Sequence, residues 1–462
     1  MDGMSQHETS AIRREPAPQN PEEAPGPRRQ ATGADARPGP AGAGPAATSG
    51  LPRWFTPVLT VAIVLAALNL RPAVTSLGAL MEETRDGLGM SGTVAGVLTS
   101  VPPLCFAVFG IAAPRLARRF GLAAVVCAGM AAITAGLVLR PFAGNTAAFL
   151  AASALSLAGI ALTNVLLPVI IKRWYPDRIG SMTGLYSMAM AIGTSLAAAV
   201  TVPMTDAVGG GWRVGLGLWA IVAIIAVVPW LPLARAARGT AAADRGKTDA
   251  MAAAGPSMLR SRTAWALACY FGFQATAAYI TMGWMPQIFR DAGVSAGQAG
   301  LLLAVTMFMG VPLAFVIPRV ASRMPNQGPI VVLLGAFGLA GYAGLYFAPA
   351  GGAWAWALLL GISNCAFPLA ITMIGLRARS AAGIVKLSAF AQSTGYLISI
   401  PGPLLIGVLY QKTDDWGLPI ALMAALMVPQ ILIGVAAGRN RQIEDEGPDG
   451  ASYGSTKPAR IA

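Results

Sequence analysis

Apolar residues fill most of this chain in long blocks, separated by short charged or Gly/Pro-rich turns. A helical block of about 20 residues spans the ~30 Å hydrocarbon layer of a bilayer. Because the backbone must satisfy its own hydrogen bonds in lipid, each block predicts a transmembrane helix rather than a barrel strand. Twelve blocks are present, at residues 54–80, 91–113, 121–140, 146–171, 180–203, 213–233, 264–286, 295–317, 328–348, 353–375, 384–410 and 417–437. The pattern predicts an all-α integral membrane protein.

Composition supports this class, since 55% of the residues are hydrophobic and 11% are charged, against about 25% charged in soluble proteins. The net charge of +13 does not indicate nucleic acid, because its placement follows the membrane. Basic residues cluster after the even-numbered blocks, whereas the opposite turns hold Arg85, Arg140, Arg213, Arg290 and Lys412. The positive-inside rule therefore predicts an inner-membrane protein with both termini in the cytoplasm.

The segments outside the blocks define the organisation of the chain. Residues 1–50 and 438–462 are predicted to be disordered cytoplasmic tails, because their composition cannot bury enough apolar surface to fold. Residues 234–263 form a charged linker between six-helix halves at 54–233 and 264–437. The four cysteines lie in apolar blocks without metal-ligand spacing, and His7 lies in the first tail, so neither a metal site nor a cofactor is expected.

An internal repeat relates the two halves. RDGLGMSGTVAG at 85–96 matches RDAGVSAGQAG at 290–300, with one residue deleted. Asn164 precedes Pro168 by four residues in the fourth block, and Asn364 precedes Pro368 in the same way in the tenth. Transporters built from repeated halves bind substrate near the bilayer midplane, between the repeats.

The twelve-helix plan resembles the major facilitator superfamily, and several segments resemble its cyanate/nitroimidazole transporter family. These segments are NLRPAVTSLGAL (69–80), APRLARRFG (113–121), TGLYSMAMAIGTSLAAAVTVP (183–203), GWRVGLGLWA (211–220), FGFQATAAYITMGWMP (271–286) and QSTGYLISIPGPLLIGVLY (392–410). The resemblance implies alternating access by two pseudo-symmetric halves and a small anion or compact heterocycle as substrate. It also implies a gating role for Arg115, Arg118 and Arg119, although the acidic residue usual in that superfamily motif is missing here.

Arg71 is the strongest candidate for substrate binding, since the segment from Trp54 to Met81 carries no other charge. A cation in the middle of a membrane helix costs roughly 2.5–3.5 kcal/mol on insertion scales, so such residues are usually functional. A guanidinium facing a central cavity could hold an anion or a nitro group in two hydrogen bonds. Pro72 leaves a backbone carbonyl unpaired one turn earlier and is a candidate hinge. The alternative is an arginine that snorkels to the interface.

Amides give a second group of candidates. Asn69 and Gln274 occupy matching positions in the first and seventh blocks, where each either contacts substrate or bonds one helix to another. Asn164 and Asn364 precede the candidate hinges Pro168 and Pro368, because a proline removes the donor for the carbonyl four residues earlier. Both asparagines are also substrate candidates, and Asn364 is the stronger because it is nearer the midplane. Weaker candidates, for which packing is the alternative, are Tyr279, Gln392 and Tyr396.

The acidic residues all fall in predicted tails or turns, which argues against proton symport through a membrane-embedded carboxylate. If flow is uncoupled, a singly charged anion would move outward, down the membrane potential. The leading hypothesis is a secondary active or facilitative transporter that works as a monomer. A multidrug efflux transporter, favoured by methionines such as Met188, Met190 and Met282, is the first alternative. A non-transporting membrane sensor is the second; the membrane region has no acid, base or metal constellation that would indicate an enzyme.

Overall fold

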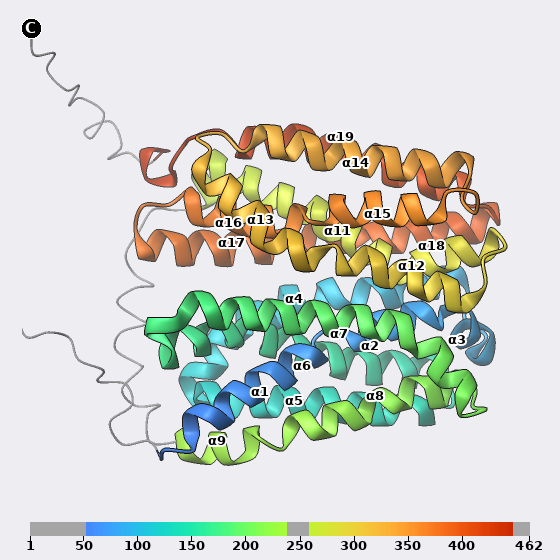
Figure 1. Ribbon diagram of the computed structural model, residues 1–462, viewed down its shortest axis with the longest axis horizontal. Coiled ribbons are helices and arrows are strands. Elements are labelled where there is room, and N and C mark those ends of the chain that lie inside the picture. Colours follow the sequence, from blue (N-terminus) through green and yellow to red (C-terminus); the bar gives the residue numbers. More distant parts are fainter. Residues whose placement is uncertain (1–51, 238–257, 447–462) are drawn as a thin grey trace, which may run out of the picture. The chain divides into compact units, whose positions relative to one another are not determined.

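The computed structural model describes residues 52–237 and 258–446, in which the regular elements are helices (Figure 1). The N-terminal half contains α1 (Phe55–Asn69), α2 (Pro72–Ala79), α3 (Met81–Leu88), α4 (Gly92–Phe120), α5 (Leu122–Leu139), α6 (Thr146–Trp174), α7 (Ile179–Ala207), α8 (Trp212–Val227) and α9 (Trp230–Ala236). The C-terminal half contains α11 (Arg262–Asp291), α12 (Ala296–Phe308), α13 (Gly310–Arg323), α14 (Gly328–Phe347), α15 (Ala353–Asn364), α16 (Ala366–Leu376), α17 (Ala381–Ser399), α18 (Pro401–Thr413) and α19 (Gly417–Ala437).

The twelve-helix, two-half arrangement predicted from the sequence is confirmed. In the described part of the chain, eleven helical spans are long and apolar enough to cross a membrane. The remaining member of the twelve is α11, a 30-residue helix that carries Gln274, Gln287 and Arg290 and is therefore less apolar. Its whole length packs against other helices of the bundle, which explains why polar residues are tolerated there.

Several predicted helices are in fact two shorter helices in succession. The first breaks at Arg71, directly before Pro72, and the tenth breaks at Cys365, three residues before Pro368. The eleventh breaks at Ile400, directly before Pro401. A proline has no N–H to donate and its ring crowds the preceding turn, so these breaks follow from local sequence.

Several helices extend beyond the predicted blocks; α11, for example, ends at Asp291 and not at 286, and α13 ends at Arg323 and not at 317. α4 continues past residue 113 to Phe120, so Arg115, Arg118 and Arg119 lie on the last turns of a helix and not in a turn. Residues 81–88, expected as a turn, form the separate helix α3, whose first turn carries Glu82 and Glu83. Carboxylates in a first turn stabilise a helix by interacting with the N-terminal end of its dipole, which accounts for this short element.

The predicted C-terminal tail also needs correction, because its first residues are folded. Residues 443–446 form a 3₁₀ helix, and the Glu446 carboxylate accepts hydrogen bonds from the Ser261 and Thr263 hydroxyls at 2.7 and 2.6 Å. Arg377, which is buried, donates to the Gly438 carbonyl at 2.8 Å, and burial lowers the pKa of its guanidinium. The tail predicted over 1–50 and most of the predicted linker lie outside the described residues.

The two halves meet along several helix pairs. α2 packs against α11, α7 against α12, and α4 against both α17 and α18. We call the end of the bundle that holds Arg115, Arg319 and Arg377 the basic end, and the end that holds Glu82 and Asp291 the acidic end. The interface between the halves therefore runs from one end of the bundle to the other.

Candidate functional site

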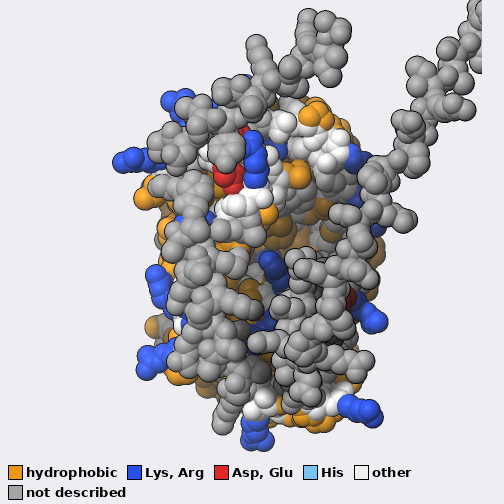
Figure 2. All heavy atoms as spheres, turned by 90° about the vertical axis from the view of Figure 1, so that its left-hand side faces the viewer, with side chains coloured by type: hydrophobic (Ala, Val, Ile, Leu, Met, Phe, Trp, Pro, Cys, Tyr) orange, Lys and Arg blue, Asp and Glu red, His pale blue; other side chains and the backbone are white. Residues whose placement is uncertain are grey.

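A cavity of about 340 Å³ lies between the two halves. Its lining comes from the α1–α2 break and α7 in the N-terminal half, and from α11, α12, α13, α15, α16 and α17 in the C-terminal half. The lining extends to Thr183 near the start of α7, to Pro318 in α13 and to Thr372 in α16, all on the side of the basic end. Figure 2, which faces that end, shows Lys and Arg side chains around a central hollow.

Arg71 brings a positive charge to this cavity. It is half-buried, and its backbone lies at the break between α1 and α2, with φ −125°. Its guanidinium is close enough to interact electrostatically with the hydroxyl groups of Tyr186, Tyr279 and Tyr396. Among the carboxylates in residues 52–237 and 258–446, none forms an ion pair with Arg71. The charge is therefore not neutralised by the described part of the protein.

Four more of the residues predicted for the site line the same cavity: Gln274, Tyr279, Asn364 and Tyr396. The Gln274 side-chain oxygen and the Tyr279 hydroxyl are buried without a hydrogen-bond partner. Asn364 makes a long contact with the Met307 sulfur at 4.0 Å. A buried polar atom without a partner is costly, so the Gln274 oxygen and the Tyr279 hydroxyl would each be stabilised by a further polar partner.

The other predicted amides do not appear in the cavity wall. Asn69 donates to the Leu65 carbonyl of its own helix at 2.8 Å, and Gln392 donates to the Ser388 hydroxyl at 2.7 Å. Asn164 accepts a hydrogen bond from the Tyr186 hydroxyl at 2.6 Å. Because Tyr186 also lies near Arg71, Asn164 has an indirect route to the site.

Hydroxyl side chains that were not predicted from the sequence also line the cavity: Thr183, Ser187, Thr194, Thr306 and Thr372. The three on α7 share the lining with Met190 and Ala191, and together these positions repeat at the three- and four-residue spacing of one helix face. That spacing was the available signal, because small hydroxyl residues on one stripe of an apolar helix mark a face that is not in lipid.

The acidic end is closed by direct contact between the halves. Arg290 of α11 forms salt bridges with Glu82 and Glu83 of α3 at 2.8 and 2.9 Å. The Gln411 side chain accepts a hydrogen bond from the Thr93 backbone N–H at 2.8 Å. These contacts block the cavity on this side, so the structure is a state that opens toward the basic end.

Backbone-to-backbone packing reinforces this closure. Gly92 and Gly96 of α4 face Gly407 of α18, and a Cβ on Gly407 would collide with the backbone of both. A Cβ on Gly78 of α2 would likewise collide with the Met282 carbonyl of α11. Glycines allow helices to approach this closely, which is a common device in membrane bundles.

The predicted gating and hinge residues occupy different environments. Pro72 is the first residue of α2, Pro368 is in α16 just after a helix break, and Pro168 is within the unbroken α6. The Arg115 side chain bonds to the Ile111 carbonyl of its own helix at 3.4 Å, and Arg119 stacks on Phe120 at 5.2 Å. Arg118 lies on the same final turns of α4.

A protein-family model for the major facilitator superfamily matches residues 59–403. This chain belongs to the major facilitator superfamily. It is therefore a multi-pass membrane transporter and not an enzyme, and the predicted class is confirmed.

Curated relatives are similar in sequence to this chain over most of its length. The chain is 36% identical over 390 residues to an uncharacterized transporter of Bacillus subtilis, YycB, covering 83% of this chain and 94% of the relative. It is 32% identical over 387 residues to the 2-nitroimidazole transporter of Escherichia coli, covering 84% of this chain and 96% of that transporter. It is 28% identical over 375 residues to the cyanate transport protein CynX of E. coli, covering 80% of this chain and 95% of CynX.

Solved structures support the same fold at low sequence identity. A D-xylose–proton symporter superposes with a TM-score of 0.67 at 12% identity, covering 85% of this chain and 99% of the symporter. A bacterial homologue of the human lysosomal transporter Spinster superposes with a TM-score of 0.64 at 16% identity, covering 84% and 96%. These similarities establish the architecture and say nothing about the substrate.

Proposed function

We propose that this protein transports a small anion or a compact polar heterocycle, such as cyanate or a nitroimidazole, by alternating access, with Arg71 as the charge that binds it. The observation that carries the proposal is an arginine in a central cavity that no carboxylate in the described residues neutralises. A guanidinium offers a planar pair of donors that matches carboxylate-like or nitro oxygens.

Neighbouring groups suit a small polar ligand. Gln274 and Tyr279 each present a buried, unpartnered polar atom, and both come from the half opposite Arg71. A ligand between them would therefore contact both halves, which is what couples binding to a movement of one half against the other. The similarity to the 2-nitroimidazole and cyanate transporters supports this substrate class.

The polar part of the cavity wall argues against the multidrug alternative. A volume of about 340 Å³ is at the lower end of the ~300–1,000 Å³ found for pockets that hold drug-sized ligands. The methionines that favoured this alternative contribute Met190, Met282 and Met307 to the wall, beside a polar set that includes Arg71. The mixture fits a compact ligand with an anionic or nitro group better than a large organic cation.

The residues that line the cavity include no Asp, Glu or His. A carboxylate that binds and releases a proton at the site is therefore not part of the proposal. We propose facilitated or exchange transport, in which uncoupled flow of an anion runs outward, down the membrane potential.

We further propose that the protein acts as a monomer in the inner membrane with the basic end in the cytoplasm. The arginine-rich turns at that end support this orientation through the positive-inside rule. In this orientation both termini are cytoplasmic, and the cavity of the present structure faces inward.

The test is ligand-induced thermal stabilisation of the detergent-purified protein with cyanate, 2-nitroimidazole and a large organic cation. A ligand at 100 times its dissociation constant stabilises the native state by about 2.7 kcal/mol. We expect a small anionic or nitro ligand to raise the melting temperature of the wild type and of Arg323→Gln, but not of Arg71→Gln. Arg323 is an exposed arginine at the basic end and serves as the matched control.

Two outcomes would overturn this assignment. Full stabilisation of Arg71→Gln would show that Arg71 is structural, and stabilisation by the large cation alone would favour multidrug efflux. Flux of the stabilising ligand into proteoliposomes then shows whether that ligand is a transported substrate, since an inhibitor would bind without being transported.

A further inference from the structure

A second arginine in the N-terminal half is completely buried. Arg140 lies at the C-terminal end of α5 on the side of the acidic end, and its exposed fraction is 0%. Sequence reasoning placed it in a turn between blocks, but its side chain turns inward. Its Nε donates to the Ser153 hydroxyl at 2.9 Å, and one Nη donates to the Ala73 carbonyl at 2.8 Å.

These contacts do not balance the charge. The remaining nitrogen of Arg140, Nη2, is buried without a hydrogen-bond partner. The guanidinium lies 5.5 Å from the centre of the Phe149 ring, and no carboxylate in the described residues forms an ion pair with it. An unpaired charge away from water costs several kcal/mol, so this site lacks one partner.

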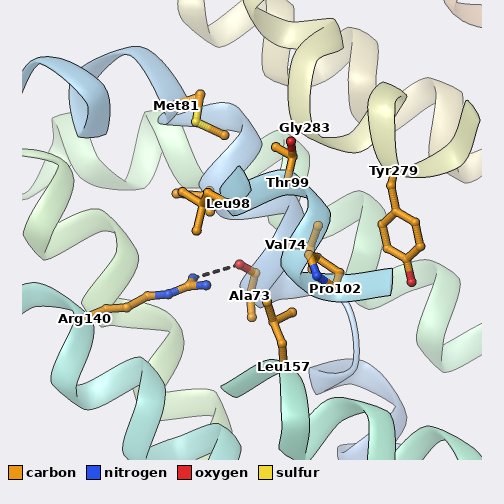
Figure 3. A pocket seen from close by; sticks show the side chains of 11 residues that line it. Ala73, Val74, Met81, Leu98, Thr99, Pro102, Arg140, Leu157, Tyr279 and Gly283 are labelled. Atoms are coloured by element: carbon orange, nitrogen blue, oxygen red, sulfur yellow. Dashed lines mark hydrogen bonds between the residues drawn. The ribbon is translucent and has the colours of Figure 1, made fainter. Parts of the chain in front are cut away.

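The guanidinium adjoins a small pocket (Figure 3). The centre of a water-sized sphere can occupy about 10 Å³ of this pocket, so the pocket has room for one particle of water size or slightly larger. Its wall is otherwise largely apolar, with Val74, Leu98, Leu157 and Met81 among the lining residues. The Thr99 hydroxyl in the wall is engaged with the Ala95 and Gly96 carbonyls of its own helix.

The pocket is separate from the cavity at Arg71. Tyr279 belongs to the wall of both, and Figure 3 shows its ring on the side of the pocket opposite Arg140. The lining also includes Gly283 of α11, so the pocket lies between the halves on the closed side of the central cavity.

We propose that the Arg140 pocket is a binding site for one small, weakly hydrated inorganic anion, such as a halide. The anion would sit against Nη2 of Arg140, supply the missing counter-charge and fill the space between the apolar residues. In a site of low dielectric constant this attraction is much stronger than in water, and the surrounding apolar wall favours an ion that gives up its hydration readily. The proposal is independent of the transported substrate.

The test compares sodium bromide with sodium gluconate at equal ionic strength in thermal unfolding of the full-length protein. Gluconate is too large for the pocket, so it controls for ionic strength. We expect bromide to raise the melting temperature of the wild type and of Arg71→Gln by on the order of 2 °C, and to have no such effect on Arg140→Gln. Arg71→Gln is the matched control, because it removes the cation of the central cavity.

A second measurement keeps the proposal testable if Arg140→Gln does not fold. Crystals of the wild type grown or soaked in bromide should show an anomalous peak in contact with the Arg140 guanidinium. The proposal is overturned if that position shows no peak or holds a water molecule in bromide. It is also overturned if the bromide effect disappears in Arg71→Gln and persists in Arg140→Gln.

Discussion

The Arg290 guanidinium lies 2.9 Å from the Glu83 carboxylate and thereby joins α11 of the C-terminal half to α3 of the N-terminal half. The same guanidinium contacts Glu82 at 2.8 Å. Asp291, the next residue, accepts hydrogen bonds from the Tyr410 hydroxyl at 2.9 Å and the Trp416 indole at 2.7 Å. One end of α11 thus anchors the closure of the acidic end.

Removing the Arg290 contacts should shift the protein toward a state that is open at the acidic end. Each partly exposed ion pair contributes about 0.2–1 kcal/mol, so Arg290→Ala should raise the open population roughly 1.4- to 5-fold for each pair lost. Phe142 and Phe347 are highly exposed near this end, in opposite halves. Spin labels at these two positions on a cysteine-free background would show longer distances by double electron–electron resonance.

The matched control is Arg379→Ala. Arg379 also forms a salt bridge, with Asp445 at 2.7 Å, but both partners lie in the C-terminal half at the basic end. An equal lengthening in both variants would show that the Arg290 contacts do not hold the acidic end closed.

A side chain at Gly407 should oppose the same closure sterically. Gly407→Ala places a methyl group against the backbone of Gly92 and Gly96, and overpacking of this kind costs about 1–3 kcal/mol. We expect slower transport and increased labelling of cysteines introduced at the acidic end. Gly297→Ala is the control, because a Cβ at Gly297 meets open space. Unchanged transport in Gly407→Ala would contradict the predicted close contact.

The Tyr279 hydroxyl should contribute directly to ligand binding if it faces the substrate. Tyr279→Phe removes one neutral hydrogen bond, worth about 0.5–1.5 kcal/mol, so the dissociation constant of the bound ligand should rise roughly 2- to 13-fold. Tyr270→Phe is the matched control, since the Tyr270 hydroxyl is also buried and unpartnered but does not line the cavity. Titration calorimetry that found equal losses in both variants would exclude a specific contact by Tyr279.

Glu446 should make folding stability depend on pH. Burial raises the pKa of its carboxyl, but hydrogen bonds from Thr263 and Ser261 outweigh burial and hold the pKa below its ordinary value of 4.5. The ionised carboxylate therefore contributes stability above that value, and the contribution is lost as the pH falls through the lowered pKa. We expect Glu446→Gln to unfold at a lower temperature than the wild type near neutral pH. This difference should disappear in acid, and a constant difference across the pH range would contradict the assignment.

Helix number and the division into halves could be predicted from the sequence. The length of an apolar block is a local property, and the bilayer requires nearly the same length of every spanning helix. Arg71 could be identified for a related reason, because a single charge between residues 54 and 81 stands out against apolar neighbours whatever the packing. The helix breaks at Arg71 and Cys365 likewise follow from nearby prolines.

The sequence did not predict in the same way whether a polar side chain points into the cavity or toward its own helix. Asn69 and Gln274 match in the internal repeat, yet Asn69 bonds to its own helix while Gln274 lines the cavity. A helix in a membrane is apolar on its lipid face and on its packed face alike, so periodicity carries little information about its rotation.

The sequence by itself determined the fold class, the two halves, and the presence of one cation within the first helix. Tertiary structure alone decided that Arg140 turns inward to Ala73, that Arg290 meets Glu83, and that the cavity closes at the acidic end. The physical reason is that spanning a bilayer depends on residues adjacent in the chain. Burial, pairing and closure depend instead on how separate helices are rotated and packed against one another.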